Sequence, residues 1–279
     1  MRFVFIILFS GLVLMTSGCM VMKMRWSDAK AQKVFHKKGI PLSIRDTLIS
    51  NRHIHYALSG PDTLPTLVFI HGSPGSWMHY HQYLADSLLG SKYRLVAIDR
   101  PGFGHSNFGK AMGLKAQAEL LLPVVTALKT DRPLFLCGHS MGGPVVVQLA
   151  AMSPETFQTI VVVAGALDAR QEKPEIWRKI MQVKPLYWLL PGAFGPSNTE
   201  LLYLKKDLIP LQQEFEKITC GVHFVHGTKD TWVPFENVAF GIQNLKNASF
   251  IKVDTLVGAD HQIPWKNYQV LRNVLLEVD

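Results

Sequence analysis

Six short, unbroken apolar runs constrain the fold of this chain more than any other feature of its sequence. Each run holds four to six residues, and longer stretches of helical periodicity separate most of the runs. An unbroken run, unlike an alternating one, predicts a strand that helices cover on both faces. The six runs are Thr66–Ile70, Arg94–Ile98, Pro133–Cys137, Thr159–Ala164, Val222–Val225 and Ser249–Val253.

Strands that alternate with helices predict a mostly parallel, doubly wound α/β sheet. Ser43–Ile49 and His53–Ser59 flank a turn at Asn51 and predict an antiparallel pair at one edge of that sheet. With 279 residues, of which 48% are hydrophobic and 18% charged, the chain is large enough to bury such a core in a single α/β unit. Helical patterns lie at about 77–89, 113–129, 141–152, 235–244 and 265–277.

One interval is much longer than a crossover between strands requires. Residues 165–221 span 57 positions, whereas a crossover needs only about a dozen or more. Aromatic residues are frequent in this interval, and Pro185, Pro191 and Pro196 are expected to break its helices. We predict a helical cap insertion over about 168–212 that lies over one end of the sheet. It is either a lid above a functional site or a purely structural elaboration.

The amino terminus has the pattern of a targeting signal. Residues 3–15 form a charge-free apolar run of 13 residues behind Arg2, which is too short to cross a bilayer that needs roughly 20 residues. Small residues and then Cys19 follow, so the segment resembles a bacterial lipoprotein signal, with Thr16 where a leucine is most common. The resemblance implies removal of residues 1–18 and lipidation of Cys19 with palmitate. An ordinary cleaved signal peptide or an uncleaved anchor is the alternative.

This signal divides the chain into three parts. Residues 19–42 form an anchor-proximal segment with a short helix that Ser27 caps and that runs to Gly39. Residues 43–279 form the α/β domain. The lipidated chain is expected at a membrane of the bacterial cell envelope, on its periplasmic or outer-membrane face.

Charge and cysteine content exclude several classes of protein. The 29 Lys and Arg against 21 Asp and Glu give a net charge of +8, which is spread along the chain, so we expect no nucleic-acid partner. Three cysteines are too few for a disulfide scaffold, and no Cys/His spacing resembles a zinc site. Cys137 and Cys220 are predicted to be buried thiols too far apart to bridge.

A serine follows the third apolar run directly, in the motif G-H-S-M-G at residues 138–142. A helical pattern begins behind it. This strand–turn–helix context is the one that a nucleophile elbow requires, and glycines two positions from the serine leave room for its strained turn. The motif therefore predicts that Ser140 is a nucleophile.

Here the chain resembles an α/β-hydrolase, and the resemblance covers nearly all of the mature sequence. It implies a sheet of the α/β-hydrolase fold with a helical cap. The loop H-G-S-P-G at residues 71–75 resembles the oxyanion-hole turn of the family. Because Pro74 has no N–H, the donors are expected to be the backbone amides of Ser73 and Met141. The turn that starts at Asp99 resembles a further family turn, and Asp99 is predicted to pin it by hydrogen bonds.

The resemblance also implies the partners of the serine, in the chain order Ser, acid, His. His226–Pro234 follows a strand and resembles the acid turn, with Asp230 as the orienting carboxylate. Gly258–Trp265 resembles the histidine turn, with His261 as the base. Asp260 is the rival acid, but a sequence neighbour can rarely point its carboxylate at the adjacent imidazole. The remaining histidines are predicted to have surface or packing roles.

These residues predict a serine hydrolase that forms an acyl-enzyme and needs no metal or organic cofactor. The first hypothesis is a carboxylesterase or lipase-like enzyme acting on a small-molecule ester with an apolar acyl or aryl group. A serine at the elbow argues against haloalkane dehalogenases and epoxide hydrolases, which carry Asp there. The alternatives are cleavage of another bond by the same residues (amide, as in prolyl aminopeptidases with their H-G-G-P-G loop, C–C or lactone) and a non-catalytic binding lipoprotein.

Overall fold

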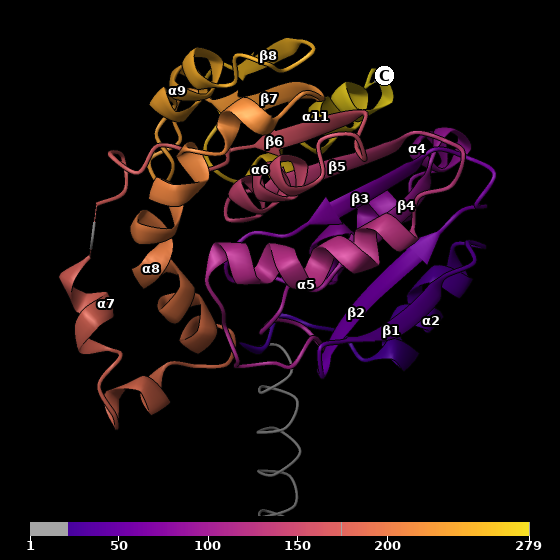
Figure 1. Cartoon of the computed structure of the whole chain (residues 1–279). Helices are drawn as coiled ribbons and strands as arrows, with labels where there is room; N and C mark the ends of the chain where they lie inside the picture. Colours follow the sequence, from indigo (N-terminus) through magenta and orange to yellow (C-terminus); the bar gives the residue numbers. More distant parts are fainter. Residues whose placement is uncertain (1–21, 174, 279) are drawn as a thin grey trace, which may run out of the picture.

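The computed structural model describes residues 22–173 and 175–278, and these residues form an α/β-hydrolase fold around one sheet (Figure 1). The lipidation prediction for Cys19 lies outside the described residues. The strands are β1 Ser43–Ile49, β2 Arg52–Ser59, β3 Thr66–Ile70, β4 Arg94–Ile98, β5 Leu134–His139, β6 Thr159–Val163, β7 Gly221–Gly227 and β8 Ile251–Leu256. The helices are α2 Asp28–Lys37, α3 His81–Leu84, α4 Ser87–Lys92, α5 Leu114–Ala127, α6 Gly142–Met152, α7 Ile176–Ile180, α8 Phe194–Gln212, α9 Glu236–Asn244, α10 Ile263–Lys266 and α11 Tyr268–Leu276, with 3-10 turns η1 Trp77–Tyr80, η2 Leu186–Leu189 and η3 Phe215–Lys217.

The sheet is mostly parallel, as predicted. Its strand order is β1-β2-β4-β3-β5-β6-β7-β8. Strands β1 and β2 pair antiparallel at one edge, and β2 is antiparallel to β4, whereas all later neighbours are parallel. Ser50 and Asn51 form the hairpin turn with φ of +48° and +61°, and a two-residue hairpin of this kind needs positive φ at both positions.

Helices cover both faces of the sheet, which explains why the central strands are apolar without interruption. Along β3, Val68 and Ile70 pack on the side of α5 and α6. Leu67 and Phe69 pack on the opposite side, where α2, α4 and α11 lie. Successive side chains of a strand point to opposite faces, so both sets must be apolar.

Two predicted helices are interrupted in the structure. The pattern at 77–89 predicted one helix, but the chain forms η1, α3 and α4 there, since the Asp86 side chain accepts hydrogen bonds from Leu88 N and Leu89 N and starts a new helix. The pattern at 265–277 is divided at Asn267 into α10 and α11. The last strand also begins two residues later than predicted, because β8 is an edge strand with exposed positions rather than an unbroken apolar run.

The interval after β6 is helical, as expected for a cap. Helix α8 returns to the body of the protein, where Leu204, Leu208 and Leu211 join the core cluster on the α5–α6 side. Pro196 does not break this helix, contrary to the prediction. It lies in the first turn of α8, where a backbone N–H has no acceptor within the helix.

Two further predictions concern the amino-terminal helix and the cysteines, and the structure confirms both. The Ser27 side chain accepts a hydrogen bond from Lys30 N at the start of α2 (3.3 Å), and Phe35 of this helix is buried. Cys137 and Cys220 are free and buried. In the described part of the chain, none of the helices is both long enough and apolar enough to span a bilayer.

Candidate active site

Ser140 lies on a tight turn between β5 and α6. Its backbone has φ of +54°, a left-handed conformation that a residue other than glycine rarely adopts. The turn is held by hydrogen bonds from Ser140 N to Val163 O (2.9 Å) and from Gly143 N to Ser140 O (2.8 Å). A Cβ atom on Gly142 would lie 2.2 Å from Ile70 O, so a side chain has no room there. The geometry is that of the predicted elbow.

Asp230 and His261 meet beyond the ends of β7 and β8. Asp230 Oδ2 lies 2.7 Å from His261 Nδ1, and both residues are buried. The other carboxylate oxygen accepts hydrogen bonds from Trp232 N and Val233 N (both 2.9 Å), so the carboxylate has a fixed orientation. Burial alone would raise the pKa of Asp230, but hydrogen bonds from His226 and His261 outweigh burial and hold that pKa below its usual value. Asp230 therefore remains an anion.

The rival acid makes different contacts. Asp260 Oδ1 accepts a hydrogen bond from Gln262 N (2.9 Å), and its other oxygen forms an ion pair with Lys266. These contacts, with the hydrogen bond to Lys266 as the main cause, lower the pKa of Asp260. The carboxylate that contacts His261 is thus Asp230, as the turn pattern predicted.

Ser140 and His261 lie at the same edge of the sheet, because both follow the carboxyl ends of parallel strands. His139, the neighbour of Ser140, donates a hydrogen bond from Nε2 to the His261 carbonyl oxygen (2.9 Å), and the two rings are 4.9 Å apart. Among the described residues, no hydrogen bond joins Ser140 Oγ to another group.

The loop after β3 lies against the serine. A Cβ atom on Gly72 would be 3.0 Å from Ser140 Cβ, so glycine permits this close approach. Neither Ser73 N nor Met141 N donates to another group within the described chain. Their assignment to an oxyanion hole stays a prediction. The Ser73 hydroxyl instead donates to Ser197 Oγ of α8 (2.8 Å).

A buried ion pair, which the sequence did not reveal, joins the cap to this loop. Arg100 and Glu200 of α8 are nearly inaccessible to solvent, and the guanidinium donates to both carboxylate oxygens (2.7 and 2.8 Å). The same guanidinium donates to His71 O (2.8 Å), Gly72 O (3.0 Å) and Gln117 Oε1 (2.8 Å). All five N–H donors of Arg100 are used. We call this group the Arg100–Glu200 clamp.

Three other histidines, His79, His139 and His226, lie near the site. Burial lowers the pKa of His139 to about 3 and the pKa of His79 to about 4, so both are neutral at pH 7. His226 Nε2 donates to Val233 O (2.9 Å) and lies 3.5 Å from Asp230 Oδ2. Their packing roles agree with the prediction, but nothing in the sequence indicated that His139 and His226 contact the Asp230–His261 pair.

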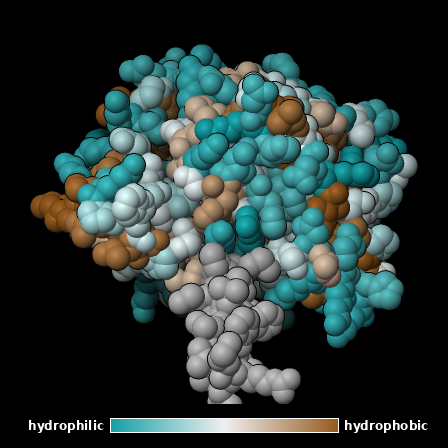
Figure 2. Space-filling view, turned by 90° about the horizontal axis from the view of Figure 1, so that it is seen from below, coloured by the Kyte–Doolittle hydropathy of each residue, from teal (hydrophilic) through white to brown (hydrophobic). Residues whose placement is uncertain are grey.

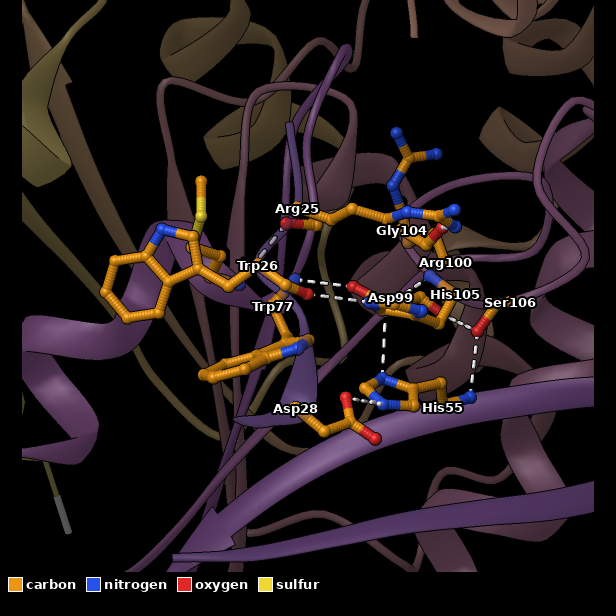
Figure 3. A network of polar contacts seen from close by, with 12 residues as sticks. Arg25, Trp26, Asp28, His55, Trp77, Asp99, Arg100, Gly104, His105 and Ser106 are labelled. Atoms are coloured by element: carbon orange, nitrogen blue, oxygen red, sulfur yellow. Dashed lines mark hydrogen bonds and ion pairs between the residues drawn. The ribbon is translucent and has the colours of Figure 1, made fainter. Parts of the chain in front are cut away.

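Asp99 pins its turn by hydrogen bonds, as predicted (Figure 3). Its carboxylate accepts from Trp77 N (2.7 Å), His105 N (2.8 Å) and His55 Nδ1 (3.1 Å). Burial would lower the pKa of His55, but the hydrogen bond and charge of Asp99 raise it above its usual value. A Cβ atom on Gly104 would lie 2.1 Å from this carboxylate. The turn has a structural role.

The segment before α2 is attached to the same turn (Figure 3). Arg25 Nη1 donates to Gly104 O (2.6 Å), and His105 Nε2 donates to Trp26 O (2.8 Å). These contacts fix the first described residues against the body of the protein.

The part of the chain that the structure describes holds no group of three or more His, Cys, Asp or Glu side chains placed to bind a metal ion.

The fold and this arrangement define a class of protein, and comparison with known families agrees. Residues 65–214 match the family model of the alpha/beta hydrolase fold, which is more than half of the chain. The chain therefore belongs to the α/β-hydrolase family.

Individual relatives are more distant. The chain is 27% identical over 135 residues to an uncharacterized hydrolase of Bacillus subtilis (48% of this chain and 48% of that protein). It is 27% identical over 197 residues to the monoglyceride lipase of Homo sapiens (68% of this chain and 60% of that protein). The matched regions thus span about half of these relatives. A bacterial membrane phospholipase A has a similar structure, with a TM-score of 0.64, 20% identity and coverage of 99% and 98% of the two chains, which shows the shared fold.

Proposed function

We propose that this protein is a serine hydrolase that cleaves an ester bond. The observation that carries the proposal is the buried 2.7 Å contact between Asp230 and His261 at the sheet edge where Ser140 occupies a strained elbow. Ser140 is the proposed nucleophile, His261 the general base and Asp230 the residue that orients the base.

The mechanism assigns one step to each group. His261 Nε2 takes the Ser140 proton as Oγ attacks the ester carbonyl carbon. Asp230, which holds Nδ1–H, fixes the tautomer and stabilises the imidazolium. The amides of Ser73 and Met141 stabilise the tetrahedral oxyanion, and removal of one such donor costs about 3–4 kcal/mol in comparable sites. His261 then protonates the leaving alcohol, an acyl-enzyme remains, and water activated by His261 releases the acid.

The proposed substrate is a small-molecule ester with an apolar acyl or aryl group. The cap supports this choice, because aromatic and aliphatic side chains are frequent in it and Ser197 of α8 contacts Ser73 in the loop after β3. The similarity to a monoglyceride lipase supports an ester rather than an amide substrate.

We further propose that lipid on Cys19 attaches the protein to a membrane of the bacterial cell envelope. The support is the sequence pattern of residues 3–19. Palmitate labelling of the wild type but not of Cys19→Ser would agree with this proposal. Equal labelling of both chains would exclude Cys19 as the acceptor.

A fluorophosphonate probe tests the catalytic proposal. We expect labelling of the wild type and of Ser73→Ala, and no labelling or p-nitrophenyl ester hydrolysis by Ser140→Ala. Ser73→Ala is the matched control, because it removes a serine hydroxyl from the neighbouring loop after β3 and leaves the elbow unchanged. Full activity of Ser140→Ala would refute the mechanism. Faster cleavage of a proline arylamide than of esters would show that the preferred bond is an amide and not an ester.

A further inference from the structure

The outer surface of the cap carries large apolar side chains that nothing in the described chain covers. Neither α7 nor η2 has a buried residue. The exposed fraction is 76% for Ile176, 70% for Trp188 and 71% for Leu189. We call the set the apolar cap face; its members are Ile176, Trp177, Ile180, Val183, Trp188 and Leu189.

The segment that carries the apolar cap face contacts α8 through polar groups. Asn198 Nδ2 of α8 donates to Arg178 O (3.0 Å), and Gln182 Nε2 donates to Thr199 Oγ1 of α8 (3.0 Å). Ile176 and Ile180 are spaced by four residues, which places them on one side of α7. Figure 2 shows hydrophobic side chains gathered at the left edge of the molecule, the side on which Figure 1 places α7.

The composition of the cap face fits a lipid surface. Two tryptophans are among its members, and tryptophan is enriched where a protein meets the boundary between hydrocarbon and water. Residues 170–190 hold five Lys or Arg against two Glu. Basic residues beside an exposed apolar surface are the pattern of segments that lie in the interface of an anionic membrane.

The amino-terminal segment reaches the protein at the same place. Ala193 N donates to Met22 O (2.9 Å), and Gly192, with φ of +53°, allows Met22 to approach. Leu189 lies four residues before Ala193. Cys19, the proposed site of lipid attachment, lies three positions before Met22 in the sequence. A membrane that holds a lipid on Cys19 would therefore be close to the cap.

We propose that the apolar cap face docks on a lipid bilayer with anionic headgroups. This contact goes beyond the proposed ester hydrolysis and does not depend on Ser140. It rests on the proposed membrane attachment only for the position of the bilayer. Docking would place the cap, and α8 behind it, against the phase in which apolar esters dissolve.

Quenching of tryptophan fluorescence by brominated lipids tests this contact. The full-length chain is returned from detergent to vesicles of phosphatidylethanolamine and phosphatidylglycerol with brominated acyl chains. We expect clear quenching in the wild type and in Ser140→Ala. The double variant Trp177→Phe/Trp188→Phe should lose most of it, because these two residues would be the ones in contact with lipid.

A charge placed on the apolar cap face should separate it from the bilayer. We expect Ile180→Glu/Leu189→Glu to lose the quenching, whereas Leu48→Glu, on the exposed edge strand β1, should keep it. All three leucine and isoleucine positions are more than half exposed, so the variants should keep the wild-type melting temperature. Vesicles of phosphatidylcholine should quench less, since each lysine near an anionic surface strengthens binding roughly fivefold.

The outcomes separate docking from the proposed anchoring. The chain could float with vesicles but show equal quenching in the wild type and in Ile180→Glu/Leu189→Glu. That result would overturn docking of the apolar cap face and would agree with attachment through Cys19 alone. Cap-dependent quenching of a chain that mass spectrometry shows to be without lipid would support docking and overturn the lipidation of Cys19. Absence of flotation would overturn both. Detergent-stable dimers that Leu189→Glu dissociates would assign the face to a second copy and overturn docking on lipid.

Discussion

Replacement of Glu200 by glutamine tests the Arg100–Glu200 clamp. The change keeps the size of the side chain but removes the charge that faces a guanidinium with almost no solvent access. It also turns one acceptor toward Arg100 into a donor, so that a donor faces a donor. Removal of one partner of a buried ion pair costs about 3–5 kcal/mol, because the other charge stays buried and uncompensated.

The expected loss can be measured as a loss of stability. In a domain of this size about 1 kcal/mol corresponds to 2–4 °C, so Glu200→Gln should lower the Tm by roughly 6–20 °C. Urea unfolding should show a lower midpoint at an unchanged slope. Because the clamp holds His71 O and Gly72 O, kcat for an ester should also fall, by up to about 100-fold if the oxyanion loop moves.

Glu277→Gln is the matched control. It removes the same charge from an ion pair with Lys252 (3.1 Å) in which both side chains are largely exposed. Such pairs contribute about 0–1 kcal/mol. If Glu200→Gln and Glu277→Gln are equally stable, the clamp does not stabilise the fold and this reasoning is refuted.

Three further predictions follow from the site. Asp230→Asn should lower kcat for a p-nitrophenyl ester by about 10⁴-fold, whereas Asp260→Asn should remain near the wild type; the opposite order would reverse the assignment of the acid. The pKa of His139 is about 3 in the folded state and 6.5 in the unfolded state, so the unfolded state binds more protons between these two pH values. The free energy of unfolding should therefore fall as the pH is lowered from about 6.5 toward 3. His139→Gln should remove about 2 kcal/mol of this loss at pH 5, and an unchanged pH dependence of urea unfolding would contradict the buried neutral state. Gly142→Ala, whose Cβ would lie 2.2 Å from Ile70 O, should lower the Tm, whereas Gly90→Ala, in helix α4 with nothing within 4 Å, should leave it unchanged or raise it; equal melting temperatures would show that the elbow tolerates a side chain.

Most of the sheet could be predicted because burial on both faces leaves a direct mark on the sequence. The run Thr66–Ile70 matches β3 at both ends, and Ser43–Ile49 matches β1. The elbow was equally visible, since glycines at 138 and 142 are required wherever a backbone approaches this closely. Each of these features depends on residues near one another in the chain.

The features that the sequence did not reveal depend on distant residues. Arg100 and Glu200 are one hundred positions apart, and no spacing rule connects an arginine in a turn to a glutamate in a cap helix. The break at Asp86 was missed for a different reason: the side-chain cap competes with a helical pattern that looks continuous. His139 was assigned a packing role correctly. Its contact with His261 could not be predicted, because it forms only when the fold brings the histidine turn beside His139.

The hydrogen bonds of Met22, Arg25 and Trp26 set the length of any tether at the amino terminus. Met22 lies only three positions after Cys19, and an extended chain spans at most about 3.5 Å per residue. The point at which a lipid would be attached to Cys19 would therefore lie no more than about 10 Å from Met22. A link of this length is too short for the protein to rotate freely above a membrane. The shape of the folded protein would therefore fix its distance from the bilayer and its tilt.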